Sequence, residues 1–534
     1  MAKDRKAIIE KKFKPLTFGT SGLRDIVENM TDMECYINSI GFIYFLEEGG
    51  EVASSIALGG DRRFSTPRIM TAVAQAIKDA GYETFCCGKV PSPTLTFYGM
   101  QNGVPSIMVT GSHIPDTRNG IKFSKPTGEV LKTDEEAILK NVAKAREEEY
   151  SKSEDETSFD VNGMFKDEHQ TPEPLRENEA IDLYVRRYLE VFPADTLNGK
   201  KIVLYQHSAV GRDIIEKILK GLGAEVQSVG RSETFVPVDT EKVSEDTRNK
   251  LKRWAKEYTP FAIVSTDGDS DRPLLADEKG EFLSGDKLGA LVSIFLKPDF
   301  AAVPISANDA VVSALTSESI EVKQTKIGSP YVIAAMNEKL ADDPSAKVVS
   351  WESNGGFLLG CDWSVENGTL KALPTRDAML PLISAIRLAI SNSETISELI
   401  EKSLPHRYTH SDVADNNTPG CSKYTADMGK EIIKMFSPKK DGEIDAIKEK
   451  LRKYFNKNRG FGKITDVNFT DGIRIVFDNG DVSHLRPSGN APEFRNYATS
   501  DTQRRADEIV KKRKEILTEM INEVIQKKQR VWGL

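Results

Sequence analysis

The chain has 534 residues, of which 39% are hydrophobic and 29% are charged, and its formal net charge is −8 at pH 7. At about 150 residues per domain, this length predicts three or four domains with a cleft between them. The composition is typical of a globular protein and excludes a disordered chain. The negative net charge argues against a general nucleic-acid binder, because affinity for a phosphate backbone comes from clustered lysines and arginines.

No segment of the sequence predicts secretion or membrane insertion. The first residues mix charges throughout and lack the apolar run of a secretory signal. The richest apolar stretch, residues 378–390, contains Pro381 and Arg387 and is too short to span a bilayer. We therefore expect a cytoplasmic protein without a membrane partner. The cysteines show neither CxxC pairing nor zinc-ligand spacing, and we expect reduced thiols at Cys35, Cys86, Cys87, Cys361 and Cys421.

The first elements in chain order are the turn FGTSGLRD, which contains Arg24, and a strand–helix–strand segment that begins at Ile56. Similar segments begin at Lys201 and near Ala301. The helical stripes of the first two segments consist of Ile69, Val73, Ala76 and Ile77, and of Ile214, Ile215, Ile218 and Leu219. Strands and helices that alternate in this way predict α/β domains with mixed or parallel sheets.

The polar loop TGSHIPDTRNGIKF follows the apolar strand PSIMV. It places Ser112 between Gly111 and His113, and we expect the serine hydroxyl to be exposed. Adjacent serine and histidine do not form the arrangement of a hydrolase, and no GxSxG elbow occurs. If the serine instead carries a phosphate, its two or so negative charges at neutral pH require a divalent ion and cations such as Lys122. From these residues alone, a polar surface turn is an equal alternative.

The sequence DGDSDR follows the apolar strand FAIVS in the second segment. Its aspartates at alternate positions, Asp267, Asp269 and Asp271, can converge on one hard cation, and carboxylate oxygens suit Mg²⁺. Strand ends are also where α/β sheets bind their ligands. An EF-hand is excluded, because Arg272 occupies the obligatory glycine position and a strand precedes the loop. An acidic solvated turn is the remaining alternative.

The sequence WESNGGF in the third segment combines an acid, an amide and two glycines. Glu352 and Asn354 offer acceptor and donor groups for vicinal sugar hydroxyls, and Gly355 and Gly356 let a ligand approach the backbone. A glycine-containing turn without a function would look the same. This loop therefore decides nothing by itself.

Beyond His406 the pattern changes to short alternating strands with DG and NG turns. A long helix from about Thr502 to Arg530 follows, and together these elements predict a smaller α+β domain. The helix has a stripe of apolar residues at helical spacing, which predicts a buried face and an opposite solvated face. We expect the solvated face to carry Arg504, Arg505, Lys511, Lys512, Arg513 and Lys514.

The loop RPSGNAPEFR lies in the same region. Two guanidinium groups, a hydroxyl, an amide and an open backbone nest can surround a phosphate. The residues that supply these groups are Arg486, Ser488, Gly489, Asn490 and Arg495. A basic loop without a ligand is the alternative.

Taken together and in this order, the loops resemble those of the α-D-phosphohexomutase superfamily, and the resemblance covers essentially the whole chain. It implies an α/β fold of four domains around a central cleft, in which three related α/β domains with mixed sheets precede a C-terminal α+β domain. The boundaries that we predict are 1–175, 176–299, 300–405 and 406–534. Residues 147–178, rich in charged residues, serine and proline, are predicted to form a linker or insertion.

By this resemblance, a phosphorylated serine and Mg²⁺ share the reacting centre. The serine is Ser112, and the metal ligands are Asp267, Asp269 and Asp271 together with an oxygen of the serine phosphate. The catalytic residues are Ser112, His113, Lys122 and Arg24, with Arg272 at the end of the metal loop. The sugar-binding residues are Glu352, Asn354, Gly355 and Lys326. The phosphate-binding residues are Arg486, Ser488, Gly489, Asn490 and Arg495.

The implied activity is reversible transfer of a phosphoryl group between the C1 and C6 hydroxyls of a hexose phosphate. It proceeds through phospho-Ser112 and a hexose 1,6-bisphosphate, which also serves as activator. The proton acceptor stays open among Lys122, His113 and Arg24. The forms ESNGG and NAPE are similar to those of bacterial phosphomannomutases and favour mannose phosphates over glucose phosphates. Two other classes stay open: a phosphatase with Asp267 as nucleophile, and a non-catalytic sensor of sugar phosphates.

Overall fold

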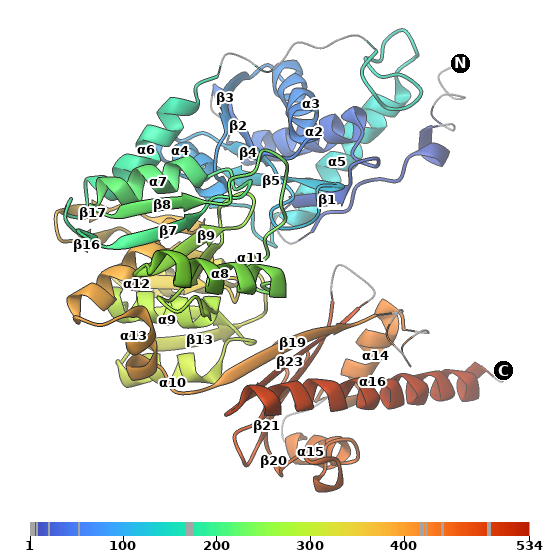
Figure 1. Ribbon diagram of the computed structural model, residues 1–534. Coiled ribbons are helices and arrows are strands. Elements are labelled where there is room, and N and C mark those ends of the chain that lie inside the picture. Colours follow the sequence, from blue (N-terminus) through green and yellow to red (C-terminus); the bar gives the residue numbers. More distant parts are fainter. Residues whose placement is uncertain are drawn as a thin grey trace. The chain divides into compact units, whose positions relative to one another are not determined.

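A computed structural model of the protein describes residues 6, 9–19, 22–51, 54–166, 172, 175–415, 418, 421, 424–438, 443–488 and 493–532. The chain divides into two units (Figure 1). The first unit comprises Met1–Val303, Glu318–Lys323 and Gly328–Ile400, and the second comprises Pro304–Ser317, Gln324–Ile327 and Glu401–Leu534. No helix in the described ranges has both the length and the apolar character that a membrane crossing requires.

The first sheet consists of β1 (Gly22–Ile26), β2 (Ser55–Gly60), β3 (Glu83–Lys89), β4 (Ser106–Val109), β5 (Arg118–Lys125) and β6 (Gly128–Glu129). Its order is β1-β5-β4-β2-β3, with β6 paired to β5. Strand β2 runs parallel to β3 and β4, whereas β5 runs antiparallel to its neighbours, so the sheet is mixed. The helices of this region are α2 (Asp32–Gly49), α3 (Thr66–Asp79), α4 (Ser92–Asn102), α5 (Glu135–Ser151) and α6 (Glu177–Leu189).

Side chains of the first sheet alternate between two apolar cores, as the pleat of a strand requires. Ile56 and Leu58 of β2 pack in a core with α2, α3 and α5, whereas Ala57 between them packs in a second core with α4 and α6. The sheet is therefore the middle of three layers. The predicted stripe on α3 is confirmed, because the first core contains Ile69, Val73, Ala76 and Ile77.

Part of the segment predicted as a linker, residues 147–178, has a defined structure. Helix α5 continues to Ser151, and Phe159 is buried in the first core, where its ring stacks on Phe165 at 4.9 Å between centroids. Within this segment, residues 167–171, 173 and 174 lie outside the described residues.

The second sheet consists of β7 (Lys201–Tyr205), β8 (Glu225–Val229), β9 (Ala262–Thr266), β10 (Pro273–Ala276) and β11 (Phe282–Leu283). Its order is β11-β10-β9-β7-β8, with β7 parallel to β8 and β9, and β10 antiparallel to β9 and β11. Its helices are α7 (Arg212–Gly221), α8 (Glu245–Tyr258) and α9 (Gly285–Leu296). The predicted stripe on α7 is confirmed by the burial of Ile214, Ile215, Ile218 and Leu219.

The third sheet consists of β12 (Phe300–Pro304), β13 (Glu321–Thr325), β14 (Val348–Trp351), β15 (Phe357–Leu359) and β18 (Leu373–Asp377), in the order β13-β12-β14-β15-β18. Strands β12 and β14 are parallel, whereas β15 runs antiparallel to β14 and β18. A small hairpin is formed by β16 (Trp363–Val365) and β17 (Gly368–Leu370). The helices are α10 (Asp309–Ser317), α11 (Ser329–Asp342), α12 (Met379–Ser391) and α13 (Ile396–Ser403).

The fourth sheet, in the second unit, is antiparallel throughout and has the order β19-β23-β22-β21-β20. Its strands are β19 (Tyr408–Ala414), β20 (Ile464–Asn468), β21 (Ile473–Phe477), β22 (Val482–Pro487) and β23 (Phe494–Ser500). The helices are α14 (Ala426–Phe436), α15 (Ile444–Arg452), a short 3₁₀ helix at Lys457–Arg459 and the long α16 (Gln503–Trp532).

One residue of α16 contradicts its predicted place on the solvated face. The Arg513 side chain is fully buried, and its guanidinium group donates to the carbonyl oxygens of His484 and Tyr497, each at 2.6 Å. Burial lowers the pKa of Arg513 to about 9. The reason lies in the helical period: Arg513 is one turn from the core residues Ile509 and Leu517, so it lies on the apolar stripe.

Candidate active site

Ser112 lies in the loop that connects β4 to β5 (the serine loop, residues 110–118). Its φ of 57° is in the left-handed region, which residues with a side chain rarely adopt. Its N–H donates to Thr110 Oγ1 at 2.8 Å, and its hydroxyl donates to Asp267 Oδ2 at 2.6 Å. Ser112 is fully buried, so the expectation of an exposed hydroxyl is wrong. The neighbouring acidic loop covers it, since a Cβ on Gly268 would lie only 2.6 Å from Ser112 O.

The acidic loop, residues 267–272, connects the antiparallel strands β9 and β10. The Asp267 N–H donates to Arg272 O at 3.1 Å, and the Ser270 N–H donates to Asp267 O at 3.2 Å, which closes a tight turn. Asp267, Asp269 and Asp271 are all buried, and each presents an oxygen within 4.8 Å of the other two. The structure thus brings the three predicted metal ligands together beside Ser112.

Two nearby cations, Lys122 and Arg272, compensate part of the charge of this loop. Lys122 on β5 donates to Asp269 Oδ2 at 2.6 Å and to Asp271 Oδ2 at 2.8 Å. Arg272 Nε lies 3.6 Å from Asp271 Oδ1 and 3.8 Å from Asp267 Oδ2. Because carboxylates this close repel one another, the cations are what allow the loop to bury its charge.

The carboxylates differ in their protonation. Burial raises the pKa of Asp267 well above its ordinary value, and repulsion by Asp269 raises it further. Burial also acts to raise the pKa of Asp269, but the charge and hydrogen bond of Lys122 outweigh it and lower that pKa. For Asp271, Arg376 likewise outweighs burial, and the pKa is lowered. Burial acts to lower the pKa of Lys122, but the two ionised aspartates raise it, so the ammonium group stays charged.

Two buried oxygens of the acidic loop have no hydrogen-bond partner among the described residues, Asp269 Oδ1 and Asp271 Oδ1. Burying an ionised oxygen without a partner is costly unless a cation binds it. Hard carboxylate oxygens gathered in this way are the donors that Mg²⁺ prefers. The donor set therefore fits a divalent cation.

His113 lies beside the reacting hydroxyl, with its Nδ1 at 3.3 Å from Ser112 Oγ. Arg272 Nη1 donates to the same nitrogen at 3.0 Å. Burial, followed by the positive charge of Arg272, lowers the pKa of His113 to about 3. Because a guanidinium group can only donate, Nδ1 carries no proton and the ring is neutral at physiological pH.

Arg24 is carried by β1, opposite Gly120 of β5. Much of its surface is exposed, yet its guanidinium group lies among protein atoms near the acidic loop. Desolvation by these atoms, followed by the charge of Arg272, lowers the pKa of Arg24 to about 10. Arg24 therefore stays charged at neutral pH.

The loop between β14 and β15 (the sugar loop, residues 352–356) carries the predicted sugar-binding residues of the first unit. The Gly355 N–H donates to Glu352 O at 2.8 Å, and Gly355 has a φ of 88°, which favours glycine. Asn354 Oδ1 accepts the Gly356 N–H at 3.0 Å, so this oxygen already stabilises the turn. The Asn354 amide nitrogen and the Glu352 carboxylate do not take part in the hydrogen bonds of the turn.

Two further residues contact the aspartates, although no pattern in the sequence predicts it. Arg376 on β18 donates from Nε to Asp271 Oδ2 at 3.0 Å and from Nη1 to Glu352 Oε2 at 2.8 Å. It therefore connects the acidic loop to the sugar loop. Ser92, the first residue of α4, donates its hydroxyl to Asp269 Oδ2 at 2.6 Å. Arg376 lies in the strand LPTRD, whose mixed composition does not predict this role.

The predicted phosphate-binding residues belong to the second unit. On the antiparallel strands β22 and β23, Arg486 pairs directly opposite Arg495. Like charges in this position destabilise a sheet, and here Arg495 is compensated by Glu493, whose Oε1 accepts from Arg495 Nε at 3.1 Å and from Nη2 at 3.0 Å. Ser488 directly follows β22, whereas Gly489 and Asn490 lie outside the described residues.

Asp471 holds the guanidinium group of Arg486. Its Oδ2 lies 2.8 Å from Arg486 Nε and accepts the Ile327 N–H at 3.0 Å. Lys326, which precedes Ile327, belongs to the second unit, whereas the other predicted sugar-binding residues belong to the first.

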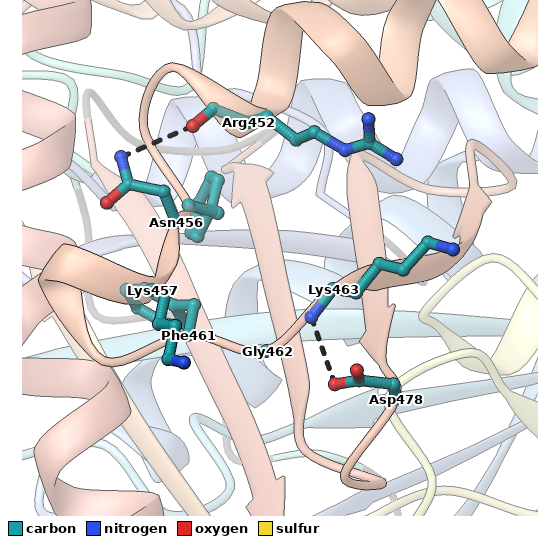
Figure 2. Close-up of a pocket in the computed structure, with 8 residues that line it drawn as sticks. Arg452, Asn456, Lys457, Phe461, Gly462, Lys463 and Asp478 are labelled. Carbon is teal, nitrogen blue, oxygen red and sulfur yellow. Dashed lines mark hydrogen bonds between the residues drawn. The ribbon is translucent and has the colours of Figure 1, made fainter.

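A pocket of about 490 Å³ in the second unit contains none of the predicted residues (Figure 2). It is lined by Arg452, Phe455, Asn456, Lys457, Phe461, Gly462, Lys463 and Asp478. Asn456 donates to Arg452 O at 3.3 Å and Asp478 accepts the Lys463 N–H at 2.9 Å, so these groups stabilise the pocket wall. In Figure 2, the lysine side chains point apart rather than toward a common point. The pocket is therefore not part of the candidate site.

Three family profiles match the chain, each described as phosphoglucomutase/phosphomannomutase: alpha/beta/alpha domain I at residues 15–149, domain II at 182–280 and domain III at 284–407. A phosphomannomutase of Salmonella muenchen is 40% identical over 500 residues, which cover 93% of this chain and 94% of that protein.

Solved structures show the same fold. A phosphoglucomutase/phosphomannomutase family protein from Burkholderia thailandensis matches with a TM-score of 0.67 at 16% identity, over 94% of this chain and 97% of that one. An N-acetylphosphoglucosamine mutase from Aspergillus fumigatus, solved with GlcNAc-6P and magnesium, matches with a TM-score of 0.52 at 13% identity, over 97% of this chain and 99% of that one. The predicted fold class is confirmed: three α/β domains with mixed sheets and a C-terminal domain with an antiparallel sheet.

Proposed function

This chain belongs to the phosphoglucomutase/phosphomannomutase family, and we propose that it moves a phosphoryl group reversibly between the C1 and C6 hydroxyls of a hexose phosphate. The observation that carries the proposal is the 2.6 Å hydrogen bond from the Ser112 hydroxyl to Asp267, inside a cluster of buried carboxylates that fits a divalent cation. The 40% identity to a phosphomannomutase, together with the ESNGG and NAPE sequences, supports mannose 1-phosphate and mannose 6-phosphate as the preferred pair.

Asp267, Asp269 and Asp271 would hold Mg²⁺, which the magnesium in the Aspergillus fumigatus complex and the unpartnered aspartate oxygens support. When bound, Mg²⁺ supplies positive charge that stabilises a transferring phosphoryl group. Lys122 and Arg272 already border the same carboxylates. Together with Mg²⁺ they would offset most of the charge of the three carboxylates and of a phosphate with about two negative charges on Ser112.

In the proposed cycle, the bond between Ser112 Oγ and phosphorus breaks as phosphorus bonds to the free sugar hydroxyl, which releases its proton to a base. The product is a hexose 1,6-bisphosphate, which is also the proposed activator. After the bisphosphate turns around, the phosphorus of its other phosphate bonds to Ser112 Oγ as its bond to the sugar oxygen breaks. The sugar oxygen takes up a proton and the isomeric monophosphate leaves.

Each of the four proposed domains, 1–175, 176–299, 300–405 and 406–534, supplies one loop to this cycle. The sugar hydroxyls would contact Glu352, Asn354, Gly355 and Lys326. The phosphate that is not being transferred would be bound in either orientation by Arg486, Ser488, Gly489, Asn490 and Arg495, since a guanidinium group can donate two parallel hydrogen bonds to a phosphate.

The three candidate proton acceptors differ in charge. Lys122 has a raised pKa and stays protonated between two carboxylates. Arg24, with a pKa lowered only to about 10, also stays charged. Of the three, His113 alone is uncharged, and its Nδ1 lies 3.3 Å from the serine hydroxyl, but this nitrogen already accepts the Arg272 N–H. We therefore assign charge compensation to Lys122 and Arg24, and His113 would take the proton only once Arg272 releases its Nδ1.

The proposal is tested by comparing kcat/KM for mannose 1-phosphate and glucose 1-phosphate, with Mg²⁺ and a hexose 1,6-bisphosphate activator. We expect isomer exchange with a preference of about tenfold for mannose, because a few loop contacts discriminate by about 1–3 kcal/mol. Ser112→Ala should abolish exchange, whereas Ser151→Ala at an exposed serine of α5 should not. A tenfold preference for glucose would contradict the substrate assignment, and release of inorganic phosphate without isomer exchange would contradict the mutase assignment.

A further inference from the structure

We infer that Arg63 is a positioning residue, which fixes the serine loop so that Ser112 Oγ is held against the metal-binding carboxylates. The inference rests on the proposed role of Ser112 in phosphoryl transfer. Arg63 follows β2 and precedes α3, and its side chain is fully buried.

The guanidinium group of Arg63 uses all five of its N–H donors. Its Nε donates to Asp61 Oδ2 at 3.1 Å. Its two terminal nitrogens donate to four backbone carbonyls of one segment: Ser112 O at 2.8 Å, Ile114 O at 2.6 Å, Pro115 O at 2.8 Å and Arg118 O at 3.0 Å. No donor is left for a substrate or a phosphate, so Arg63 acts through the loop.

The serine loop needs such an anchor because its own backbone does little to hold it. Within it, the Ile114 N–H donates to Gly111 O at 3.4 Å and the Arg118 N–H donates to Pro115 O at 3.0 Å. Ser112 meanwhile adopts an unfavourable φ of 57°, a conformation that persists only where the surroundings enforce it. The loop also approaches Arg63 closely, since a Cβ on Gly111 would lie 2.7 Å from Arg63 Cζ.

Asp61 completes the anchor at the other end of the loop. It is buried, and its Oδ2 accepts the Thr110 hydroxyl at 2.8 Å in addition to Arg63 Nε. Thr110 Oγ1 in turn accepts the Ser112 N–H at 2.8 Å. The buried pair Asp61 and Arg63 therefore holds the backbone of Ser112 from both sides, through its N–H and through its carbonyl oxygen.

The same guanidinium group connects the serine loop to the acidic loop. Arg63 Cζ lies 3.9 Å from the centroid of the Phe235 ring, within cation–π distance. Phe235 and Ser112 O both border Gly268, where a Cβ would lie 2.9 Å from the ring and 2.6 Å from the oxygen. A shift of Arg63 would therefore change the distance between the serine hydroxyl and the aspartates.

Arg63→Lys separates positioning from charge. Lysine keeps the positive charge but has three donors and no planar fork, so it cannot serve four carbonyls and a carboxylate. Arg62→Lys is the matched control, because Arg62 is the preceding residue and its guanidinium group pairs with Glu233 at 2.9 Å instead of the serine loop.

We expect Arg63→Lys to lower kcat by about 100-fold, since misplacing a reacting group by about 1 Å costs this much. The KM should stay within about twofold of wild type, because the sugar loop loses no contact. Both should hold per phosphorylated site, counted by mass spectrometry of the Ser112 peptide. Arg62→Lys should leave both values unchanged.

Hydrogen exchange of the serine-loop amides gives a readout that does not need activity. In Arg63→Lys these amides should exchange faster, while those of β4 and β9 stay unchanged. If wild type shows no isomer exchange but Arg63→Lys loosens the loop, the proposed function fails and the positioning role stands.

Normal kcat per phosphorylated site in Arg63→Lys, or unchanged loop exchange, would overturn the inference. If Arg63→Lys does not fold, Phe235→Leu takes its place, because it removes the ring above the guanidinium group and keeps an apolar side chain. We expect about a threefold to tenfold lower kcat at unchanged KM, and an unchanged kcat in that variant would equally overturn the inference.

Discussion

Arg376 allows the charge balance of the site to be tested by a single substitution. Its side chain is 7% exposed and donates to Asp271, which is 2% exposed, and to Glu352, which is 10% exposed. Arg376→Met keeps most of the volume but leaves both carboxylates without this cation. Removing one partner of a buried ion pair costs about 3–5 kcal/mol, because the remaining charge is buried without compensation. We expect the free energy of unfolding in a chelator to fall by that amount.

The assay is urea unfolding followed by tryptophan fluorescence, to which Trp351, buried next to the sugar loop, contributes together with the other three tryptophans. Arg387→Met is the control, since Arg387 pairs with Glu366 at the surface, where side-chain exposures are 27% and 40%. Such pairs contribute about 0–1 kcal/mol. Mg²⁺ should restore more stability to Arg376→Met than to wild type, because a bound cation compensates Asp271. A loss no larger than that of the control would refute the reasoning.

The acidic loop, His113 and Arg486 each give a separate prediction. Asp269→Asn removes one of three converging carboxylates, so Mg²⁺ affinity measured by calorimetry should fall at least about tenfold and kcat about 100-fold; unchanged affinity would contradict the metal site. The pKa of His113 is lowered from 6.5 to about 3, so His113 should not titrate between about pH 5.5 and 8. The pH dependence of kcat/KM in this range should therefore have the same shape in wild type and in His113→Asn. Because the unfolded chain binds this proton near pH 6.5 and the folded chain only near pH 3, the stability of wild type should fall as pH drops through that range, and less so in His113→Asn. Arg486→Met should raise the KM for hexose phosphates by about 10- to 100-fold with little loss of stability, since it removes a charge-assisted contact to phosphate, and an unchanged KM would count against this assignment.

The reacting loops could be predicted because each follows a short apolar strand, and this local pattern survives in the sequence. Ser112 follows β4, and the aspartates follow β9. The sheets then bring these loops together, so that residues separated by 155 positions, Ser112 and Asp267, share a hydrogen bond. The types of residue needed for phosphate and metal chemistry made the grouping recognisable before any contact was known.

The supporting contacts could not be predicted, because they depend on packing between distant segments. Arg376 and Asp271 are separated by 105 positions, and Arg63 reaches carbonyls about fifty positions away. The burial of Ser112 likewise depends on the close approach of Gly268. Arg513 is different, since the helical period alone placed it on the core stripe. The charge of the Arg513 side chain favoured exposure to solvent, whereas the helical spacing indicated burial, and the side chain is buried.

The central claim is that Ser112 carries the phosphoryl group that is transferred. The protein would be labelled with radioactive phosphate by a labelled hexose bisphosphate, freed of ligand and mixed in a single turnover with unlabelled mannose 1-phosphate and Mg²⁺. We predict that the label is on Ser112 before mixing and appears in hexose 1,6-bisphosphate afterwards, and that Ser112→Ala takes up none. Label on Asp267, or label released as inorganic phosphate while the sugar stays a monophosphate, would contradict the account.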